Sequence, residues 1–137
     1  MEPEPTIAPP SSLLFVNGTL MKGLALHANL DGAVFLEDVA TAARYRLYSI
    51  GDRHPGMHAV ESGGVAVLGE LYRVPEDVLE RVIRGEPPGL FVGSVELADE
   101  RVVPGVLHDP QRLRPTDRDI SDHGGWRAYI SSDTRDG

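Results

Sequence analysis

A tight turn at the end of an apolar segment is the first place in this sequence where chemistry is expected. Residues 13–16 are apolar and lead into Asn17 and Gly18, and a second glycine, Gly23, follows five residues later. Glycine adopts backbone angles that other residues avoid, and successive N–H groups in such a turn can point at one ligand oxygen. The alternative is a tight turn that binds nothing. We predict a site for a small carboxylate formed by Asn17, Gly18, Thr19, Leu20 and Met21.

Two titratable side chains near this turn are candidates for acid–base catalysis. His27 lies four residues after Gly23, and an imidazole exchanges a proton near neutral pH. Glu86 follows Gly85 and precedes two prolines, and a carboxylate is an effective base when it is partly desolvated. Each has a structural alternative: His27 caps or packs against a short helix, and Glu86 faces solvent in a loop.

Two further histidines have a spacing that metal ligands use on a helix. His54 and His58 are four residues apart, which would place both on one helical face. Pro55 and Gly56 between them disfavour a helix, and no third ligand is evident, so loop polarity is the preferred interpretation. We expect neither a metal nor a cofactor.

Three other side chains are expected to have structural roles. Tyr45 and Tyr48 lie three apart on an expected strand and so face opposite sides, which lets at most one of them line a cavity. Glu70 stands beside apolar residues and, if buried, needs a partner such as Arg46. We interpret it as half of a structural ion pair rather than as an acid of the pocket.

The segment FVNGTLMKG, residues 15–23, resembles the Tyr-Gly-Thr-Leu signature that opens the gamma-glutamylcyclotransferase-like fold. Asn17 stands where the cyclotransferases have tyrosine. With that difference, the sequence from about residue 13 to residue 129 resembles more narrowly the C-terminal domain of allophanate hydrolases. Four further segments occur in the order of that family: LALH (24–27), YRLY (45–48), PG (55–56) and GGWRAY (124–129).

This resemblance implies an α+β fold with a small curled or barrel-like mixed β-sheet and one main helix. It also implies that Tyr48, Pro55 and Gly56 contact the ligand, with His54 to His58 in a loop over the mouth of the pocket. Allophanate hydrolases carry this domain behind an amidase, for which 137 residues leave no room. We therefore expect an accessory domain that stands alone, as a homodimer or with a separate amidase as its partner.

Three functions follow from the resemblance. In allophanate hydrolases, a histidine in the stretch of His27 has been proposed to assist loss of CO2 from N-carboxycarbamate, and backbone amides with an imidazole suit that step. In the cyclotransferases, a glutamate after the helix takes a proton from the substrate amine, which makes Glu86 the alternative catalytic residue. Its flanking prolines and Asn17 depart from the cyclotransferase pattern. The third function is a non-catalytic module that binds an amidase.

The composition excludes several classes of partner. Thirteen Lys and Arg residues against 21 Asp and Glu give a formal charge of −8, which is unsuited to binding nucleic acid or an anionic membrane. The chain has no cysteine, so disulfides and cysteine nucleophiles are ruled out. No apolar run approaches the ~20 residues of a membrane-spanning helix, and no signal-peptide pattern is present. We expect a cytoplasmic protein.

Short apolar segments between glycines and charged residues predict a structure rich in strands. The main helix is expected at residues 75–84, since Pro75 suits the first helical position and Glu76 and Asp77 suit its positive end. Seven short strands indicate a barrel or a strongly curled sheet. These strands are expected at residues 13–16, 33–38, 45–50, 57–61, 65–73, 91–98 and 101–108.

The remaining segments complete the expected organisation. One domain is predicted over residues 12–131, after a disordered Pro/Glu-rich lead at 1–11 and before a flexible tail at 132–137. Trp126, the only tryptophan, is expected to dock on the sheet and close the fold.

Overall fold

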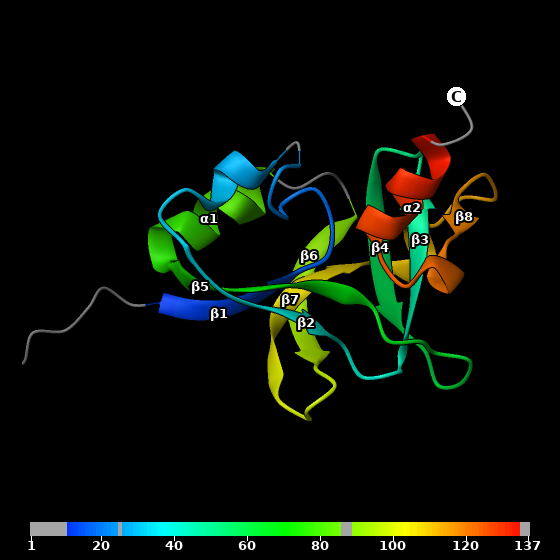
Figure 1. Ribbon diagram of the computed structural model, residues 1–137, viewed down its shortest axis with the longest axis horizontal. Coiled ribbons are helices and arrows are strands. Elements are labelled where there is room, and N and C mark those ends of the chain that lie inside the picture. The colour runs from blue at the N-terminus through cyan, green and yellow to red at the C-terminus, as the bar shows by residue number, and fades with distance from the viewer. Residues whose placement is uncertain (1–10, 25, 86–88, 135–137) are drawn as a thin grey trace, which may run out of the picture.

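The computed structural model describes residues 11–24, 26–85 and 89–134, and in them it contains two β-sheets and two α-helices (Figure 1). The larger sheet has five strands in the order β2-β5-β1-β7-β6. Strand β1 pairs antiparallel with β5 and parallel with β7, so the sheet is mixed, as expected. Its strands are β1 (Ser11–Val16), β2 (Val34–Ala40), β5 (Leu68–Pro75), β6 (Leu90–Glu96) and β7 (Val102–His108).

The larger sheet is strongly curled but is not closed into a barrel. Its edge strands β2 and β6 meet at one end only, through a bridge between Thr41 and Leu97. There the N–H of Ala42 donates to the C=O of Glu96 at 2.9 Å. The expectation of a mixed, curled sheet is confirmed, and a closed barrel is wrong, because two of the predicted strands pair with each other in a second sheet.

The second sheet has three strands in the order β4-β3-β8, namely β3 (Tyr45–Ile50), β4 (His54–Ala59) and β8 (Arg118–Asp119). Residues 54–56, expected in a loop, are thus the first half of an edge strand. Pro55 pairs with Ser49 there, and an edge strand tolerates proline because one side of it needs no N–H donor. The strand fixes the direction of the His54 side chain, which a loop would leave free.

The main helix is α1 (Glu76–Gly85), which Figure 1 shows over β1 and β5. Glu76 and Asp77 occupy its first turn as expected, whereas Pro75 is the last residue of β5 rather than the first of the helix. Val78 and Val82 are buried, whereas the apolar side chain of Ile83 is 51% exposed. The buried face is therefore narrower than the apolar stripe in the sequence.

The C-terminal part runs through short helical turns into α2 (Trp126–Thr134). Residues 109–123 contain η2 (Pro110–Arg112), β8 and η3 (Ser121–His123). An earlier helical turn, η1 (His27–Leu30), follows β1. Trp126 is buried as expected. Of the expected lead and tail, the structure describes only Ser11, which begins β1, and residues 132–134, whose backbone continues α2.

The core is one cluster of buried side chains that extends from α1 and the larger sheet to the second sheet and α2. Leu14, Phe15 and Val16 at the end of β1 are fully buried in it, so the turn that follows β1 starts from a fixed point. Within residues 11–24, 26–85 and 89–134, no helix is long and apolar enough to cross a membrane.

Candidate binding pocket

The turn after β1 is held tightly against the second sheet. The N–H of Met21 donates to the C=O of Gly18 at 2.9 Å and closes the turn. A Cβ on Gly18 would lie 2.5 Å from the Cγ and Cδ atoms of Pro55, far inside van der Waals contact. Gly18 is not among the residues with positive φ. The expectation that its unusual backbone angles matter is therefore wrong; glycine is required here because Pro55 comes so close.

Three successive N–H groups of this turn have no acceptor within the part of the chain that the structure describes. The C=O groups of Gly18 and Thr19 accept hydrogen bonds from Met21 and Leu26. By contrast, the N–H groups of Gly18, Thr19 and Leu20 donate to no residue in the described part of the chain. A backbone N–H that is shielded from water needs an acceptor, so these three donors form a preorganised place for an anionic oxygen.

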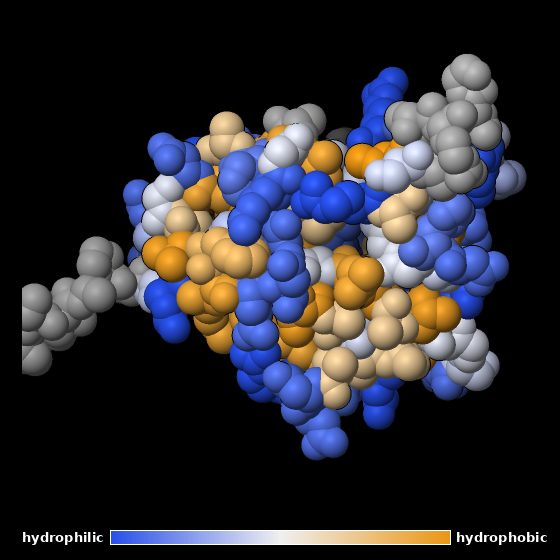
Figure 2. Space-filling model, in the orientation of Figure 1, coloured by the Kyte–Doolittle hydropathy of each residue, from blue (hydrophilic) through white to orange (hydrophobic). Residues whose placement is uncertain are grey.

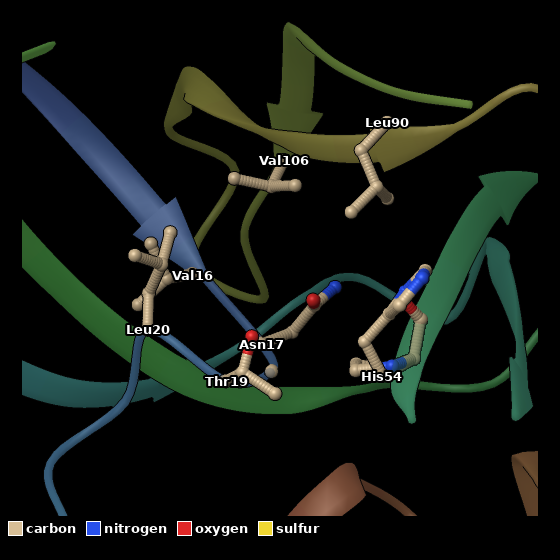
Figure 3. Close-up of a pocket in the computed structure, with 9 residues that line it drawn as sticks. Val16, Asn17, Thr19, Leu20, His54, Leu90 and Val106 are labelled. Atoms are coloured by element: carbon tan, nitrogen blue, oxygen red, sulfur yellow. The ribbon is translucent and has the colours of Figure 1, made fainter. Parts of the chain in front are cut away.

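These residues line a narrow pocket between the two sheets (Figure 3). Its volume is about 240 Å³ including the part open to solvent. Leu90 and Val106 form one wall, opposite Asn17 and Thr19. The lining residues come from β1 and its turn, β4, β6 and β7: Val16, Asn17, Gly18, Thr19, Leu20, His54, Pro55, Leu90 and Val106.

Asn17 supplies a polar side chain to the pocket from a buried position. It is 3% exposed, and its Nδ2 donates to Sδ of Met57 on β4 at 3.3 Å. Sulfur is a weak acceptor, so this contact orients the amide at little cost.

His54 is the titratable side chain that lines the pocket. It is 8% exposed, and its Nδ1–H donates to the C=O of Pro55 at 3.1 Å. Among the described residues, Nε2 of His54 has no hydrogen-bond partner. The sequence-based interpretation assigned this histidine to loop polarity, because the proline after it concealed the strand.

His108 lies behind the pocket and was not singled out in the sequence at all. It is 2% exposed, and its Nδ1 is buried without a hydrogen-bond partner among the described residues. Burial, and then the nearby His54, lower the pKa of the His108 imidazole. The alternation Val106-Leu107-His108, which puts the histidine on the same strand face as a pocket residue, is the signal that would have found it.

His27 is not part of this pocket. It lines a separate hollow of about 590 Å³, including the part open to solvent, together with Lys22, Phe35 and Tyr72. Its Nδ1–H donates to the C=O of Leu20 at 2.9 Å, so the ring holds the outer side of the binding turn. The structure thus brings His27 to the turn but not to the face of the turn that carries the free N–H groups.

The other candidate ligand contacts are distributed differently. Tyr48 does not line the pocket and instead stacks on His58, with ring centroids 5.7 Å apart. Gly56 lies under His108, where a Cβ would come within 2.8 Å of Cγ. Met21 is buried beside Trp126, next to a second cavity. Glu86 lies outside the described residues.

Glu70 is buried, as half of an ion pair, but its partner is not the expected Arg46. Its Oε2 accepts a hydrogen bond from Nη2 of Arg127 at 3.2 Å, and its Oε1 accepts from the hydroxyl of Tyr72 and the N–H of Lys22. Burial and then Glu70 raise the pKa of Tyr72 above its ordinary value. Arg46 pairs instead with Asp119 at 2.8 Å.

Residues capable of holding a metal are not gathered in one place. Across the described ranges, no group of three His, Asp or Glu side chains is close enough to bind a metal ion. His54 and His58 sit four apart on an extended strand, which spaces them by roughly 13 Å and prevents joint coordination.

The open mixed sheet, its single long covering helix and the pocket at the β1 turn define the gamma-glutamylcyclotransferase-like class of folds. An AIG2-like protein from Mus musculus shares this fold with a TM-score of 0.59, at 23% identity over 77% of this chain and 80% of its own. At that identity the likeness is one of fold alone.

Within that class, the chain belongs to the allophanate hydrolase C-terminal domain family, whose model matches residues 12–131. A protein specific to uropathogenic E. coli is 42% identical, with a TM-score of 0.85 over 89% of this chain and 97% of its own. The Kluyveromyces lactis allophanate hydrolase is 31% identical, with a TM-score of 0.82 over 90% of this chain and 21% of its own.

A curated relative is much longer than this chain. The urea amidolyase of Saccharomyces cerevisiae is 31% identical over 135 residues, which are 92% of this chain but only 7% of that protein. The shared part is therefore a small fraction of a large enzyme.

Proposed function

We propose that the pocket at the β1 turn binds a compact carboxylate and assists the decarboxylation of N-carboxycarbamate. The observation that carries this proposal is that the N–H groups of Gly18, Thr19 and Leu20, three successive residues that line one narrow cavity, donate to no described residue. Donors fixed in advance stabilise an anionic oxygen without reorganising when it arrives. The narrow space favours a group of carboxylate size over a long side chain.

The chemistry of this step makes two demands on the pocket. One carboxylate of the substrate must be held while the other leaves as CO2. The electrons of the broken C–N bond remain on nitrogen, which takes up a proton and yields carbamate. The free N–H groups meet the first demand. His54, whose Nε2 has no described partner, is the pocket residue that can meet the second, since His27 lies outside the cavity.

Family membership supports this choice of substrate, and it supports a protein partner as well. Because the matched relative is a far longer urea amidolyase, we propose that this chain acts together with an amidase. Exposed apolar side chains at the start of β2, namely Val34 and Leu36, offer a contact surface. Figure 2 shows hydrophobic surface on the face that this strand presents.

A cyclotransferase or amine-lyase function is the competing enzymatic proposal. It depends on Glu86, outside the described residues, and on a fold likeness to the AIG2-like protein. Asn17 stands where those enzymes have tyrosine, and this difference weakens the cyclotransferase proposal. We therefore include it as an arm of the binding test rather than as an equal candidate.

The first experiment measures the unfolding temperature with malonate, which resembles N-carboxycarbamate, and in parallel with γ-glutamyl-alanine and 5-oxoproline. A ligand at about 100 times its dissociation constant stabilises the folded state by roughly 2.7 kcal/mol, enough to raise the unfolding temperature of a chain of this size by several degrees. A shift with malonate alone is expected. A shift with the γ-glutamyl ligands alone would favour the cyclotransferase function, with Glu86 as the catalytic residue.

A matched pair of glycine variants locates the site. In Gly18→Ala the new methyl group collides with Pro55 and displaces the free N–H groups, so the malonate shift should disappear. In Gly63→Ala the new side chain strains the backbone, because Gly63 has a φ of 74°, but Gly63 does not line the pocket and has open space around it. That variant should keep the full malonate shift, and its loss there would show that the pocket is not the site.

Activity is tested by adding the chain to allophanate together with an amidase. We expect CO2 and ammonia to be released faster when this chain is present. We expect no such acceleration with the Gly18→Ala variant. A malonate site without any effect on release would leave binding, or the positioning of an amidase product, as the function of the pocket.

A further inference from the structure

The pocket offers an anion hydrogen-bond donors but little positive charge. Of the nine described residues that line it, none is lysine or arginine, and the single titratable one is His54. Moving a carboxylate from water into a largely apolar cavity is costly unless a compensating charge accompanies it. The groups that can supply a positive charge are therefore the imidazole of His54 and any titratable side chain that packs next to the pocket lining.

His108 stands in that position. Val106 lines the pocket, and side chains two apart on a strand point to the same face, so the His108 ring follows Val106 on the pocket side of β7. Its cross-strand neighbour on β6 is Leu90, also a lining residue. The ring is thus next to the cavity although it does not reach its surface.

Two glycines leave space for this ring and hold it in place. A Cβ on Gly56 would lie 2.8 Å from Cγ of His108, and a Cβ on Gly89 would lie 2.8 Å from Nε2. Any larger residue at either position would displace the ring. The imidazole is therefore tightly packed, 2% exposed, and still has Nδ1 without a hydrogen-bond partner among the described residues.

The charged groups around His108 come from several elements. His54 on β4 disfavours a charge on the ring, and Asp109 at the end of β7 and Asp117 before β8 favour one. Arg112 in η2 also lies near the ring, within 3.4 Å of the same Cβ position on Gly89. Burial is the largest influence and lowers the pKa of the His108 imidazole.

We propose that a carboxylate enters this pocket together with one proton, which the His54–His108 pair takes up and holds against the bound anion. The inference rests on the carboxylate site proposed above. It assigns His54 to contact the ligand directly and His108 to act through His54 as a positioning and charge-supplying residue. One proton is expected rather than two, because two imidazolium rings side by side would repel each other.

The test is the titration of the folded chain with malonate by calorimetry, between about pH 6.5 and pH 8.5. Uptake of one proton predicts that the dissociation constant falls about tenfold for each unit of decreasing pH. Repeating the titration at one pH in phosphate and in Tris, which differ in enthalpy of ionisation, counts the protons directly. An uptake approaching one proton per malonate is expected.

Variants identify the groups that take up the proton. His108→Gln should bind malonate with markedly reduced proton uptake and a flatter pH dependence. Since His108 is buried and this variant can fail to fold, His54→Asn, at the pocket wall, serves as the second test and should show the same loss. His58→Gln is the matched control: it lies on the same strand, stacks on Tyr48 and is not a lining residue, so proton uptake should be unchanged.

The outcomes separate this inference from the function on which it rests. If malonate does not bind at any pH, both the carboxylate site and the proton coupling are wrong. If malonate binds with a pH-independent dissociation constant and no proton uptake, the site stands and the coupling is wrong. Full proton uptake in both His108→Gln and His54→Asn would also overturn the assignment to this pair.

Discussion

Arg127 on α2 lies over Glu70 on β5, with Nη2 of the guanidinium 3.2 Å from Oε2 of the carboxylate. The same nitrogen donates to the C=O of Lys22 at 3.0 Å, and the N–H of Lys22 donates to Oε1 of Glu70 at 3.0 Å. One buried carboxylate therefore ties the C-terminal helix, the central sheet and the far end of the binding turn together.

Arg127→Ala is expected to destabilise the protein by about 1–3 kcal/mol, measured as the free energy of unfolding in urea. The substitution leaves the buried carboxylate of Glu70 without its cationic partner. The free energy of desolvating this carboxylate is then no longer compensated, which destabilises the folded state. The effect stays below that of a fully buried pair because the Arg127 side chain is half exposed.

The control for this prediction is Arg84→Ala. Arg84 pairs with Glu80 one turn away on α1, and both side chains are largely exposed. An exposed pair of this kind contributes about 0.5 kcal/mol or less. Equal losses in the two variants would contradict the view that Glu70 is the centre of a buried network.

Trp126→Ala is expected to cost about 3–5 kcal/mol, the range for deleting a large buried aromatic side chain. The ring is 4% exposed and packs near Tyr129, with centroids 5.5 Å apart. Thermal or urea unfolding measures the loss. Phe91→Ala serves as the comparison, since that ring is 47% exposed; an unmoved unfolding midpoint for Trp126→Ala would mean that α2 does not dock as described.

The sequence predicted much of the fold because its local patterns agree with the final structure. Glu76 and Asp77 mark the start of α1, and the polar turn after residues 13–16 ends β1. Whether the sheet closes could not be predicted from local patterns, because closure depends on which strands pair. The segments around Tyr45 and Met57 have the pattern of strands, but this pattern does not indicate that they pair with each other in a second sheet rather than with β2 or β6.

The site was predicted in part. Asn17, Gly18, Thr19 and Leu20 line the pocket, since a turn keeps successive residues together whatever the rest of the chain does. His108 was missed because its proximity to His54 depends on β4 packing against β7, a contact between distant segments. The role of Gly18 also came from a distant residue, Pro55, rather than from its own backbone angles.

Acid is expected to destabilise the protein partly through Asp117. Its carboxylate accepts hydrogen bonds from the N–H groups of Gly51 and Arg114. Burial opposes ionisation, but these bonds and the Arg114 guanidinium outweigh it and leave the pKa of Asp117 below its ordinary value. A lowered carboxyl pKa means that this stabilisation is complete above the unfolded value of about 3.9 and is lost as the pH falls through the folded value.

Urea unfolding between about pH 7 and pH 2.5 measures this contribution. Asp117→Asn should be less stable than the unmodified protein at neutral pH, because an amide offers one acceptor oxygen where the carboxylate offers two. The difference between the two proteins should shrink below about pH 4. A constant difference over the whole range would show that ionisation of Asp117 does not contribute.

His27→Ala separates a residue that supports the turn from one that performs chemistry in the pocket. His27 donates to the C=O of Leu20 from outside the cavity, so its loss should cost about 0.5–1.5 kcal/mol of folding free energy. Malonate affinity should fall less than in Gly18→Ala, since the free N–H groups of the turn remain, and proton uptake on binding should persist. If His27→Ala instead abolished CO2 release while malonate affinity and proton uptake were unchanged, His27 rather than His54 would supply the proton, and the turn would have to open to admit its ring.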